Sequence, residues 1–133
     1  MPKKTTHDAS GKPRILVVED DSFLAGMYVT KLGLEGFSVD LASDGREGLK
    51  KAKDGKPDLV LLDIVLPVMD GFTMLEHMKS DPELRSIPVV LLTNLGQKSD
   101  VEKGLNLGAA DYLIKAHFMP NEVIEKIKRI LNG

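Results

Sequence analysis

Cysteine and tryptophan are absent from the 133-residue sequence, and its aromatic residues are only four Phe and two Tyr. Without cysteine the chain can form no disulfide, catalytic thiolate or zinc–thiolate site. Long apolar runs are also missing, so no segment can span a membrane as a helix. The first thirteen residues are polar and lack the apolar centre of a signal peptide. We therefore expect a cytoplasmic domain over residues 14–133, preceded by a flexible leader over residues 1–13.

An excess of charge of one sign is missing too. The 18 basic and 20 acidic side chains give a net charge of -2, which offers no basic surface for nucleic acid. The sequence has no GxxxxGK[ST] loop and no GxGxxG after its first apolar run, so we expect no nucleotide binding. What is present is 42% hydrophobic and 29% charged residues, a composition typical of a globular domain.

Strand-like and helix-like segments alternate along the chain. Short apolar runs typical of buried strands occupy residues 14–20, 37–42, 58–63, 89–94 and 111–115. Each run is followed by a segment with apolar residues at helical spacing. This alternation predicts an α/β fold, a single-domain doubly wound parallel sheet of five strands with five helices covering both faces.

Local signals mark where the helices begin and end. Asp44–Glu47 and Ser99–Glu102 have the spacing of capping boxes, the second ahead of an apolar face that includes Leu105. Gly36 is expected to end the first helix, and Pro120 fits the first position of the last one.

Polar side chains stand where four of the five predicted strands end. Glu19 and Asp20 end the first strand, Asp63 the third, Thr93 the fourth and Lys115 the fifth. In an open parallel sheet, ligands bind beyond the carboxyl ends of the strands, where the strand order reverses. These side chains should therefore share one cleft. That placement explains why an acid interrupts the otherwise apolar run 59–69.

Carboxylates held close together repel each other and favour a hard divalent cation. Mg²⁺ prefers octahedral oxygen coordination and keeps several of its waters. The expected ligands are Asp20, Asp63 and the backbone carbonyl of Val65, with Glu19 bound directly or through water.

A carboxylate beside a cation and an ammonium group can act as a nucleophile toward phosphorus. Lys115 and the metal would offset charge on the phosphoryl oxygens, and the Thr93 hydroxyl would bond one of them. Phosphoryl transfer needs mainly positioning and charge stabilisation. The residues therefore predict phosphorylation of Asp63.

Four segments resemble the motifs of the receiver domain of two-component response regulators, the CheY-like family. They are ILVVEDD, LVLLDIVLPVMDG, PVVLLTN and GAADYLIK, in the family's order and each at a strand end. The match covers residues 14–131. The resemblance implies the flavodoxin-like strand order 2-1-3-4-5.

The resemblance also implies a signalling role. Asp63 would accept a phosphoryl group from a phosphohistidine of a histidine kinase or histidine phosphotransfer protein. Glu19 and Asp20 would be the acidic pair that holds Mg²⁺, for which Mn²⁺ could substitute. Such a chain is not an enzyme in the usual sense, because it catalyses only its own phosphorylation and dephosphorylation.

The remaining matched residues would form the switch. Lys115 would pair with Asp63 or its phosphoryl oxygen, while Thr93 and the backbone of Asn94 would bind the phosphoryl group. Tyr112 would be the aromatic residue whose rotamer follows Thr93. The surface of the fourth helix, fifth strand and fifth helix would then control an unknown downstream protein, with the chain as a monomer or a weak dimer through that surface. We expect no direct contact with nucleic acid or membrane.

The sequence departs from the family pattern at Asn94, where the family often has Ala or another small residue, and at Ala116. Ala116 follows Lys115, where the family usually has Pro joined by a cis bond. Because a cis bond before a non-proline residue costs about 2.5–4 kcal/mol, we expect a trans bond here. Val65 and Leu95 occupy positions that affect hydrolysis of the phosphoryl group in this family. Apolar side chains cannot orient an attacking water, so we hypothesise slow self-dephosphorylation.

Other interpretations of the same residues exist. Each polar residue alone has a structural explanation, such as a helix cap for the first-strand acids or a turn for Asp63. A pseudo-receiver, a binding module without phosphotransfer, is the alternative function, and Ala116 is its best support. A phosphohydrolase with an Asp nucleophile typically needs a second Asp at position 65, where this chain has Val65.

Overall fold

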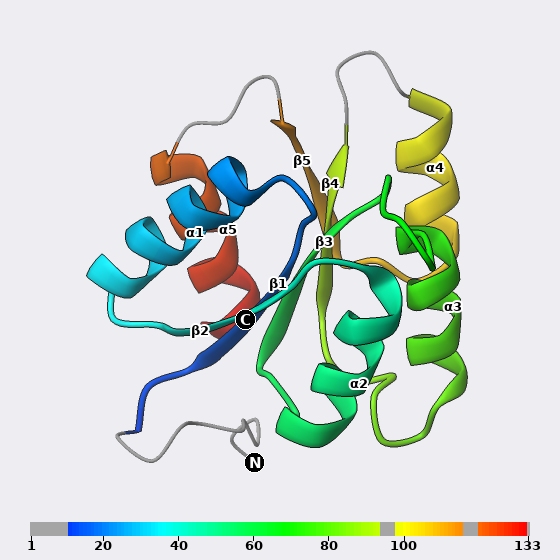
Figure 1. Cartoon of the computed structure of the whole chain (residues 1–133), viewed down its shortest axis with the longest axis horizontal. Helices are drawn as coiled ribbons and strands as arrows, with labels where there is room; N and C mark the ends of the chain where they lie inside the picture. Colours follow the sequence, from blue (N-terminus) through cyan, green and yellow to red (C-terminus); the bar gives the residue numbers. More distant parts are fainter. Residues whose placement is uncertain (1–10, 94–97, 116–119, 133) are drawn as a thin grey trace.

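A parallel sheet of five strands lies at the centre of the computed structural model, which describes residues 11–93, 98–115 and 120–132 (Figure 1). The strands are β1 (Arg14–Val18), β2 (Ser38–Ala42), β3 (Leu59–Asp63), β4 (Val89–Thr93) and β5 (Asp111–Ile114). Their order is β2-β1-β3-β4-β5, and every neighbouring pair is parallel. The predicted fold class and strand order are confirmed.

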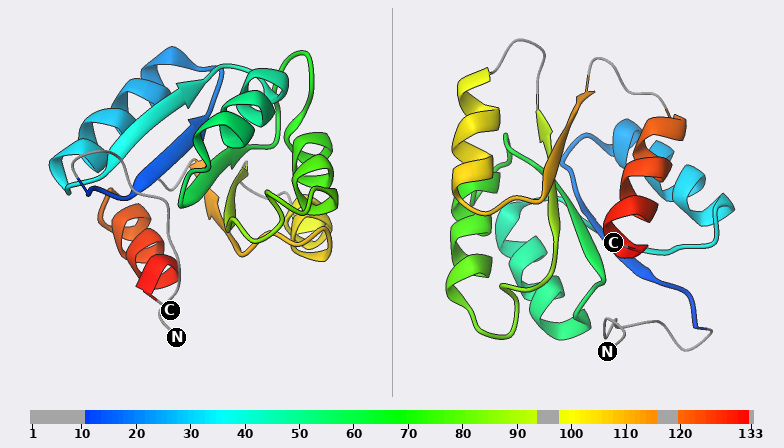
Figure 2. Two further views of the ribbon diagram at one scale, coloured as in Figure 1. Left: turned by 90° about the horizontal axis from the view of Figure 1, so that it is seen from below. Right: turned by 180° about the vertical axis from the view of Figure 1, so that it is seen from behind.

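Five helices cover the two faces of this sheet. They are α1 (Ser22–Leu34), α2 (Gly45–Gly55), α3 (Gly71–Ser80), α4 (Lys98–Asn106) and α5 (Pro120–Asn132). The views in Figure 2 place α1 and α5 on one face and α2, α3 and α4 on the other. The last helix begins at Pro120, as the sequence predicts.

The central strands are buried on both faces, which is why their sequences are continuously apolar. Every residue of β3 and β4 is buried. Alternate residues of these strands enter two separate cores. Leu62 and Leu91 pack in the core beneath α2, α3 and α4, whereas Leu61 and Leu92 pack in the core beneath α1 and α5. Each fully buried Leu contributes about 1.5–3 kcal/mol relative to an exposed one.

Aspartates cap the first three helices. The carboxylate of Asp21 accepts hydrogen bonds from the backbone of α1, Asp44 caps α2 and Asp70 caps α3. The predicted cap at Asp44 is confirmed, but Glu47 does not complete a reciprocal capping box. Its carboxylate accepts from the backbone N–H of Ser43 at 2.7 Å instead of that of Asp44.

The predicted start of α4 needs correction. The capping box at Ser99 is wrong, because α4 begins at Lys98 and Ser99 lies inside it. Its predicted apolar face is also wrong, since Leu105 is 43% exposed. Gly104 is the buried residue of this helix, and a Cβ there would clash with Leu91 of β4. Gly36 ends α1 as the sequence predicts, one position after the cap residue Glu35 and with a φ of 90°.

Candidate functional site

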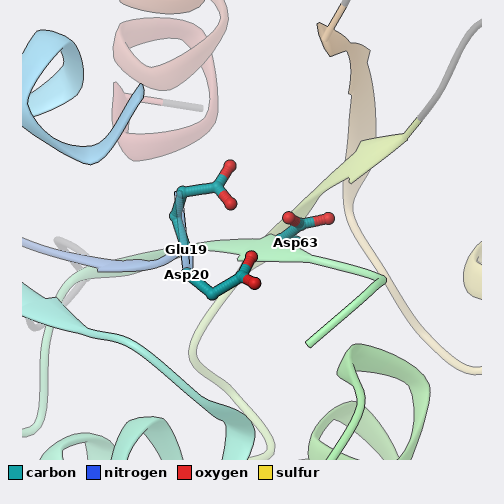
Figure 3. Close-up of side chains that lie close together, drawn as sticks. All are labelled: Glu19, Asp20 and Asp63. Atoms are coloured by element: carbon teal, nitrogen blue, oxygen red, sulfur yellow. The ribbon is translucent and has the colours of Figure 1, made fainter. Parts of the chain in front are cut away.

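Three carboxylates meet at the carboxyl ends of β1 and β3. Glu19 and Asp20 directly follow β1, and Asp63 is the last residue of β3. The two strands are neighbours, with Val18 opposite Leu62. Figure 3 shows the three side chains directed toward one space, and a carboxylate oxygen of each lies within 4.8 Å of the others. The structure therefore brings together the acids that the sequence predicts to meet.

The three carboxylates differ in their exposure to solvent. Glu19 and Asp63 are each 2% exposed, whereas Asp20 is exposed. Burial, together with the hydrogen bond with Asp63 and the charge of that residue, raises the pKa of Glu19 to about 7. The cluster thus contains a buried acid whose ionised form is disfavoured unless a cation is near.

Lys115 supplies a positive charge to this cluster from the end of β5. Its Nζ lies 2.8 Å from Asp63 Oδ2 and 3.1 Å from Glu19 Oε1. Burial lowers the pKa of Lys115, but the hydrogen bonds and charges of Asp63 and Glu19 outweigh burial, so that the pKa is raised. The ammonium group is therefore charged and held against the buried carboxylates.

Thr93 and Tyr112 lie on the neighbouring strands. Thr93 ends β4 and is 1% exposed, and its hydroxyl donates to the backbone oxygen of Leu113 at 3.4 Å. Tyr112 of β5 is partly buried against the core beneath α2, α3 and α4. Lys126 of α5 lies 5.4 Å from the centre of the Tyr112 ring and donates to its backbone oxygen at 2.8 Å.

The segment after β3 also touches the cluster. The backbone N–H of Val65 donates to Asp63 Oδ1 at 3.2 Å, and the Val65 side chain is 65% exposed. The Val65 carbonyl as a metal ligand stays a prediction. Asn94 and Leu95, and the bond from Lys115 to Ala116, lie outside the described residues.

The chemistry of the cluster fits a hard divalent cation. All of its ligand atoms are carboxylate oxygens, which Mg²⁺ prefers. Glu19 Oε1 is buried 3.1 Å from the Lys115 ammonium group, so a metal ion that binds this oxygen would compete with Lys115 for it.

One buried residue whose pKa responds to this site was not among the candidates from the sequence. Tyr28 of α1 is 2% exposed and lies in the core beneath α1 and α5. Burial raises its pKa, and the charges of Glu19 and Asp63 add to the effect. Its place on the inner face of α1 was readable from helical spacing, but its nearness to the acids depends on how α1 packs.

A family model described as the response regulator receiver domain matches residues 15–128. The chain belongs to this family. Phosphorylation and binding of Mg²⁺ at an acidic pocket are typical of receiver domains, and the three carboxylates of this chain form such a pocket. As a receiver domain of a two-component response regulator, the chain is a signalling module and not a classical enzyme.

Similar proteins agree with this assignment. One relative is the DNA-binding dual master transcriptional regulator RpaA of Synechocystis sp. (strain ATCC 27184 / PCC 6803 / Kazusa). The two sequences are 38% identical over 119 residues, and the match covers 90% of this chain and 49% of RpaA. A second relative is the alkaline phosphatase synthesis transcriptional regulatory protein PhoP of Bacillus subtilis (strain 168). It is 39% identical to this chain over 118 residues, and the match covers 89% of this chain and 48% of PhoP. The chain thus spans about half the length of these curated relatives.

A solved structure gives the same picture. The receiver domain of sensor histidine kinase PA1611 from Pseudomonas aeruginosa PAO1 superposes with a TM-score of 0.85 at 29% identity, covering 92% of this chain and 99% of that one. That structure has a magnesium ion coordinated in its active-site cleft.

Within the described part of this chain, no helix is both long and apolar enough to cross a membrane.

Proposed function

We propose that Asp63 is the phospho-acceptor of this receiver domain and takes its phosphoryl group from a phosphohistidine of a histidine kinase or histidine phosphotransfer protein. The observation that carries the proposal is the cluster itself. Asp63 lies with two further carboxylates within 4.8 Å, and its Oδ2 is 2.8 Å from the Lys115 ammonium group. Few other arrangements of side chains provide a nucleophile, a cation site and a fixed positive charge in one cleft.

In the proposed reaction, a carboxylate oxygen of Asp63 attacks phosphorus. A P–O bond forms and the P–N bond to the donor imidazole breaks, and the imidazole nitrogen keeps the bonding electron pair. No oxidant or reductant is needed, and the product is an aspartyl phosphate. Lys115, whose Nζ lies 2.8 Å from Asp63 Oδ2, would pair with the phosphoryl oxygens and offset their negative charge.

Glu19, Asp20, Asp63 and the Val65 carbonyl are the groups that would hold Mg²⁺. When bound, the ion supplies positive charge that offsets the negative charge of the phosphoryl oxygens. Mn²⁺ should substitute, because it also favours carboxylate, carbonyl and water ligands.

The proposed switch starts at Thr93. Its hydroxyl bond to the Leu113 carbonyl is long, at 3.4 Å, so little is lost when the hydroxyl turns toward a phosphoryl group on Asp63. Asn94 would add a backbone N–H, and Tyr112 would follow Thr93. The outcome would be a changed α4–β5–α5 surface, used as a monomer or through weak dimerisation.

The downstream partner and the cellular location of the domain can be proposed only in general terms. We propose that the domain over residues 14–133 acts in the cytoplasm through contacts with a downstream protein. RpaA is named as DNA-binding, but its match to this chain covers about half of RpaA, and we assign no DNA contact to the domain itself. Because Val65 offers no polar side chain to orient water, we propose that the aspartyl phosphate decays slowly.

Intact-mass measurement tests the proposed function. The chain is incubated with phosphoramidate, a small P–N donor, with and without Mg²⁺. We expect one added phosphoryl group that requires Mg²⁺ and is lost in Asp63→Asn but kept in the control Asp54→Asn, which changes an exposed carboxylate of α2. A wild-type chain that gains no phosphoryl group would refute the proposal and favour the pseudo-receiver.

A further inference from the structure

The side chain of Lys126 reaches from one face of the sheet to the other. β5 is the last strand of the sheet, and α5 lies over one face of it (Figure 2). Val123 and Ile127 of α5 pack in the core beneath α1 and α5, whereas Tyr112 packs against the core beneath α2, α3 and α4. Lys126 starts on α5 and contacts Tyr112, so its side chain passes over the edge of β5 and links α5 to the opposite face.

Three contacts hold the Lys126 ammonium group at this edge. Its Nζ lies 3.3 Å from Asp111 Oδ1, donates to the Tyr112 carbonyl at 2.8 Å, and lies 5.4 Å from the centre of the Tyr112 ring. Asp111 Oδ1 is itself held, because it accepts from the backbone N–H of Tyr112 at 2.8 Å. The first two contacts do not involve the Tyr112 ring, so they fix the ammonium group whichever way that ring points.

Close packing does not place this ammonium group. The Lys126 side chain is 23% exposed and borders a cavity of about 380 Å³ between β5 and α5. Its position therefore follows from its polar partners on β5. A cation near the face of an aromatic ring is attracted by the negative charge of that face. The Tyr112 ring gains this attraction in its present rotamer and loses it if it turns away from Lys126.

We propose that Lys126 is a positioning residue that holds the Tyr112 ring in its present rotamer and opposes its turn toward Thr93. This inference rests on the proposed function, in which Tyr112 follows Thr93 once Asp63 carries a phosphoryl group. Because Asp111 and the Tyr112 carbonyl keep the ammonium group in place, the ring loses its contact with the charge when it turns. That contact favours the present rotamer by about two- to fivefold. Lys126 thus opposes the change that the phosphoryl group drives.

Fluorine NMR of the chain labelled with 3-fluorotyrosine tests the proposal. The chain has two tyrosines, so Tyr112→Phe removes the Tyr112 resonance and leaves that of Tyr28. Spectra are recorded with Mg²⁺, first without and then with increasing beryllofluoride, a stable mimic of a phosphoryl group on a carboxylate. The Tyr112 resonance reports the rotamer of the ring, and its titration gives the affinity for beryllofluoride.

The variants separate the charge of Lys126 from its hydrogen bond. Lys126→Met removes both, Lys126→Gln removes the charge but keeps an N–H donor, and Lys126→Arg keeps both. The control is Lys128→Met, which makes the same substitution on the same helix at a lysine that pairs with Glu35 at 3.7 Å. Urea unfolding verifies that each variant folds, and Lys126→Gln carries the comparison if Lys126→Met does not.

Without beryllofluoride, we expect the Tyr112 resonance of Lys126→Met and Lys126→Gln to move toward its position in the beryllofluoride-bound wild type. The move should correspond to a change of about two- to fivefold in the ratio of the two rotamers. Coupling between two sites is reciprocal, so both variants should also bind beryllofluoride about two- to fivefold more tightly. Lys126→Arg and Lys128→Met should match wild type in both measurements. A purely structural role of Lys126 would not tighten binding.

Several results would overturn the proposal. An unchanged Tyr112 resonance in Lys126→Met and Lys126→Gln would mean that core packing alone sets the rotamer. The same shift in Lys126→Arg would show that the charge is not the cause. A shifted resonance without tighter beryllofluoride binding would disconnect Tyr112 from Asp63. A wild-type chain that phosphoramidate phosphorylates, but whose Tyr112 resonance ignores beryllofluoride, would refute this inference and leave Asp63 as acceptor. A wild-type chain that gains no phosphoryl group would refute the proposed function itself.

Discussion

Lys115 is the residue at which two demands on the cleft conflict. Its ammonium group pairs with Asp63 and Glu19, which stabilises the metal-free cluster, but it also repels an incoming divalent cation. The same charge is needed on the phosphoryl oxygens during transfer. Removing it should therefore separate cation binding from phosphorylation.

We predict that Lys115→Met binds Mg²⁺ about tenfold more tightly than wild type and is phosphorylated more slowly. Titration calorimetry at about pH 8.5, where Glu19 is largely ionised in wild type, measures the affinity. Lys126→Met is the control, because Lys126 pairs with Asp111 and not with the acids of the cleft. Weaker Mg²⁺ binding in Lys115→Met would show that the lysine organises the cation site instead of competing for it.

A second prediction for a single residue concerns the effect of Val68, whose φ is 68°, on the stability of the fold. Val68→Asn should raise the free energy of unfolding by about 1 kcal/mol, because Asn tolerates the positive φ at lower cost. Urea unfolding without Mg²⁺ measures this. The control is Val65→Asn, which replaces a similarly exposed Val without a positive φ and should give no such gain. A loss of stability in Val68→Asn would mean that the Val side chain stabilises the loop.

At the scale of elements, the β3–α3 loop is held by its contact with the first turn of α2. A Cβ on Gly45 would overlap the Met69 carbonyl, which is the acceptor for the Gly45 N–H. We predict that Gly45→Ala lowers the free energy of unfolding by about 2 kcal/mol or more, through overpacking and a lost hydrogen bond.

Gly26→Ala is the control variant for Gly45→Ala, because it makes the same substitution at a position with free space. Gly26 lies inside α1 with nothing within 4 Å of an added Cβ, so the substitution should stabilise the protein by about 0.5–1 kcal/mol. Denaturant curves of both variants give the comparison. Similar effects of the two substitutions would mean that the loop gives way to Ala at position 45.

The start of α2 predicts a dependence on pH. The backbone hydrogen bond from Ser43 lowers the pKa of Glu47 below its usual value of 4.5. A lowered folded-state pKa contributes stability that is present above the unfolded value and is lost as pH falls through the folded value. Because the Glu47 side chain is 41% exposed, Glu47→Ala should cost only a few tenths to about 1 kcal/mol near pH 7.

That difference between Glu47→Ala and wild type should shrink steadily below pH 4.5. Urea midpoints measured across this range report it, with Glu76→Ala on the exposed side of α3 as control. A difference that is independent of pH would assign the effect to helix propensity and not to the Ser43 bond.

The elements differ in how far the sequence predicts them. The strands and the first residue of α5 could be predicted from local patterns. Continuous apolar runs are typical of buried strands, and Pro120 fits the first position of a helix. The acids of the cleft were predictable for the same reason, since strand ends fix their position along the sheet. The buried face of α4 was not, because Gly104 carries no apolar signal and its role depends on the side chain of Leu91. The positive φ of Val68 was not predictable either, because the neighbouring residues of the loop impose it although a Val side chain disfavours it.

At the scale of the whole molecule, the cleft and the proposed output surface are parts of one sheet. Asp63 and Thr93 end neighbouring strands, and Thr93 bonds β5, which also carries Tyr112 and leads into Lys115. A change of charge at Asp63 therefore has a short route to β5 and α5. The proposed signalling role requires that the phosphoryl group is placed on Asp63 and on no other carboxylate.

The measurement that tests this claim most directly is peptide mapping by mass spectrometry. The chain is treated with phosphoramidate and Mg²⁺ and then with borohydride, which reduces an acyl phosphate to the alcohol. We expect the reduced residue at position 63 only, and only in samples that contained Mg²⁺. A reduced side chain at Glu19 or Asp20, or no reduced residue in a sample whose intact mass shows an added phosphoryl group, would contradict it.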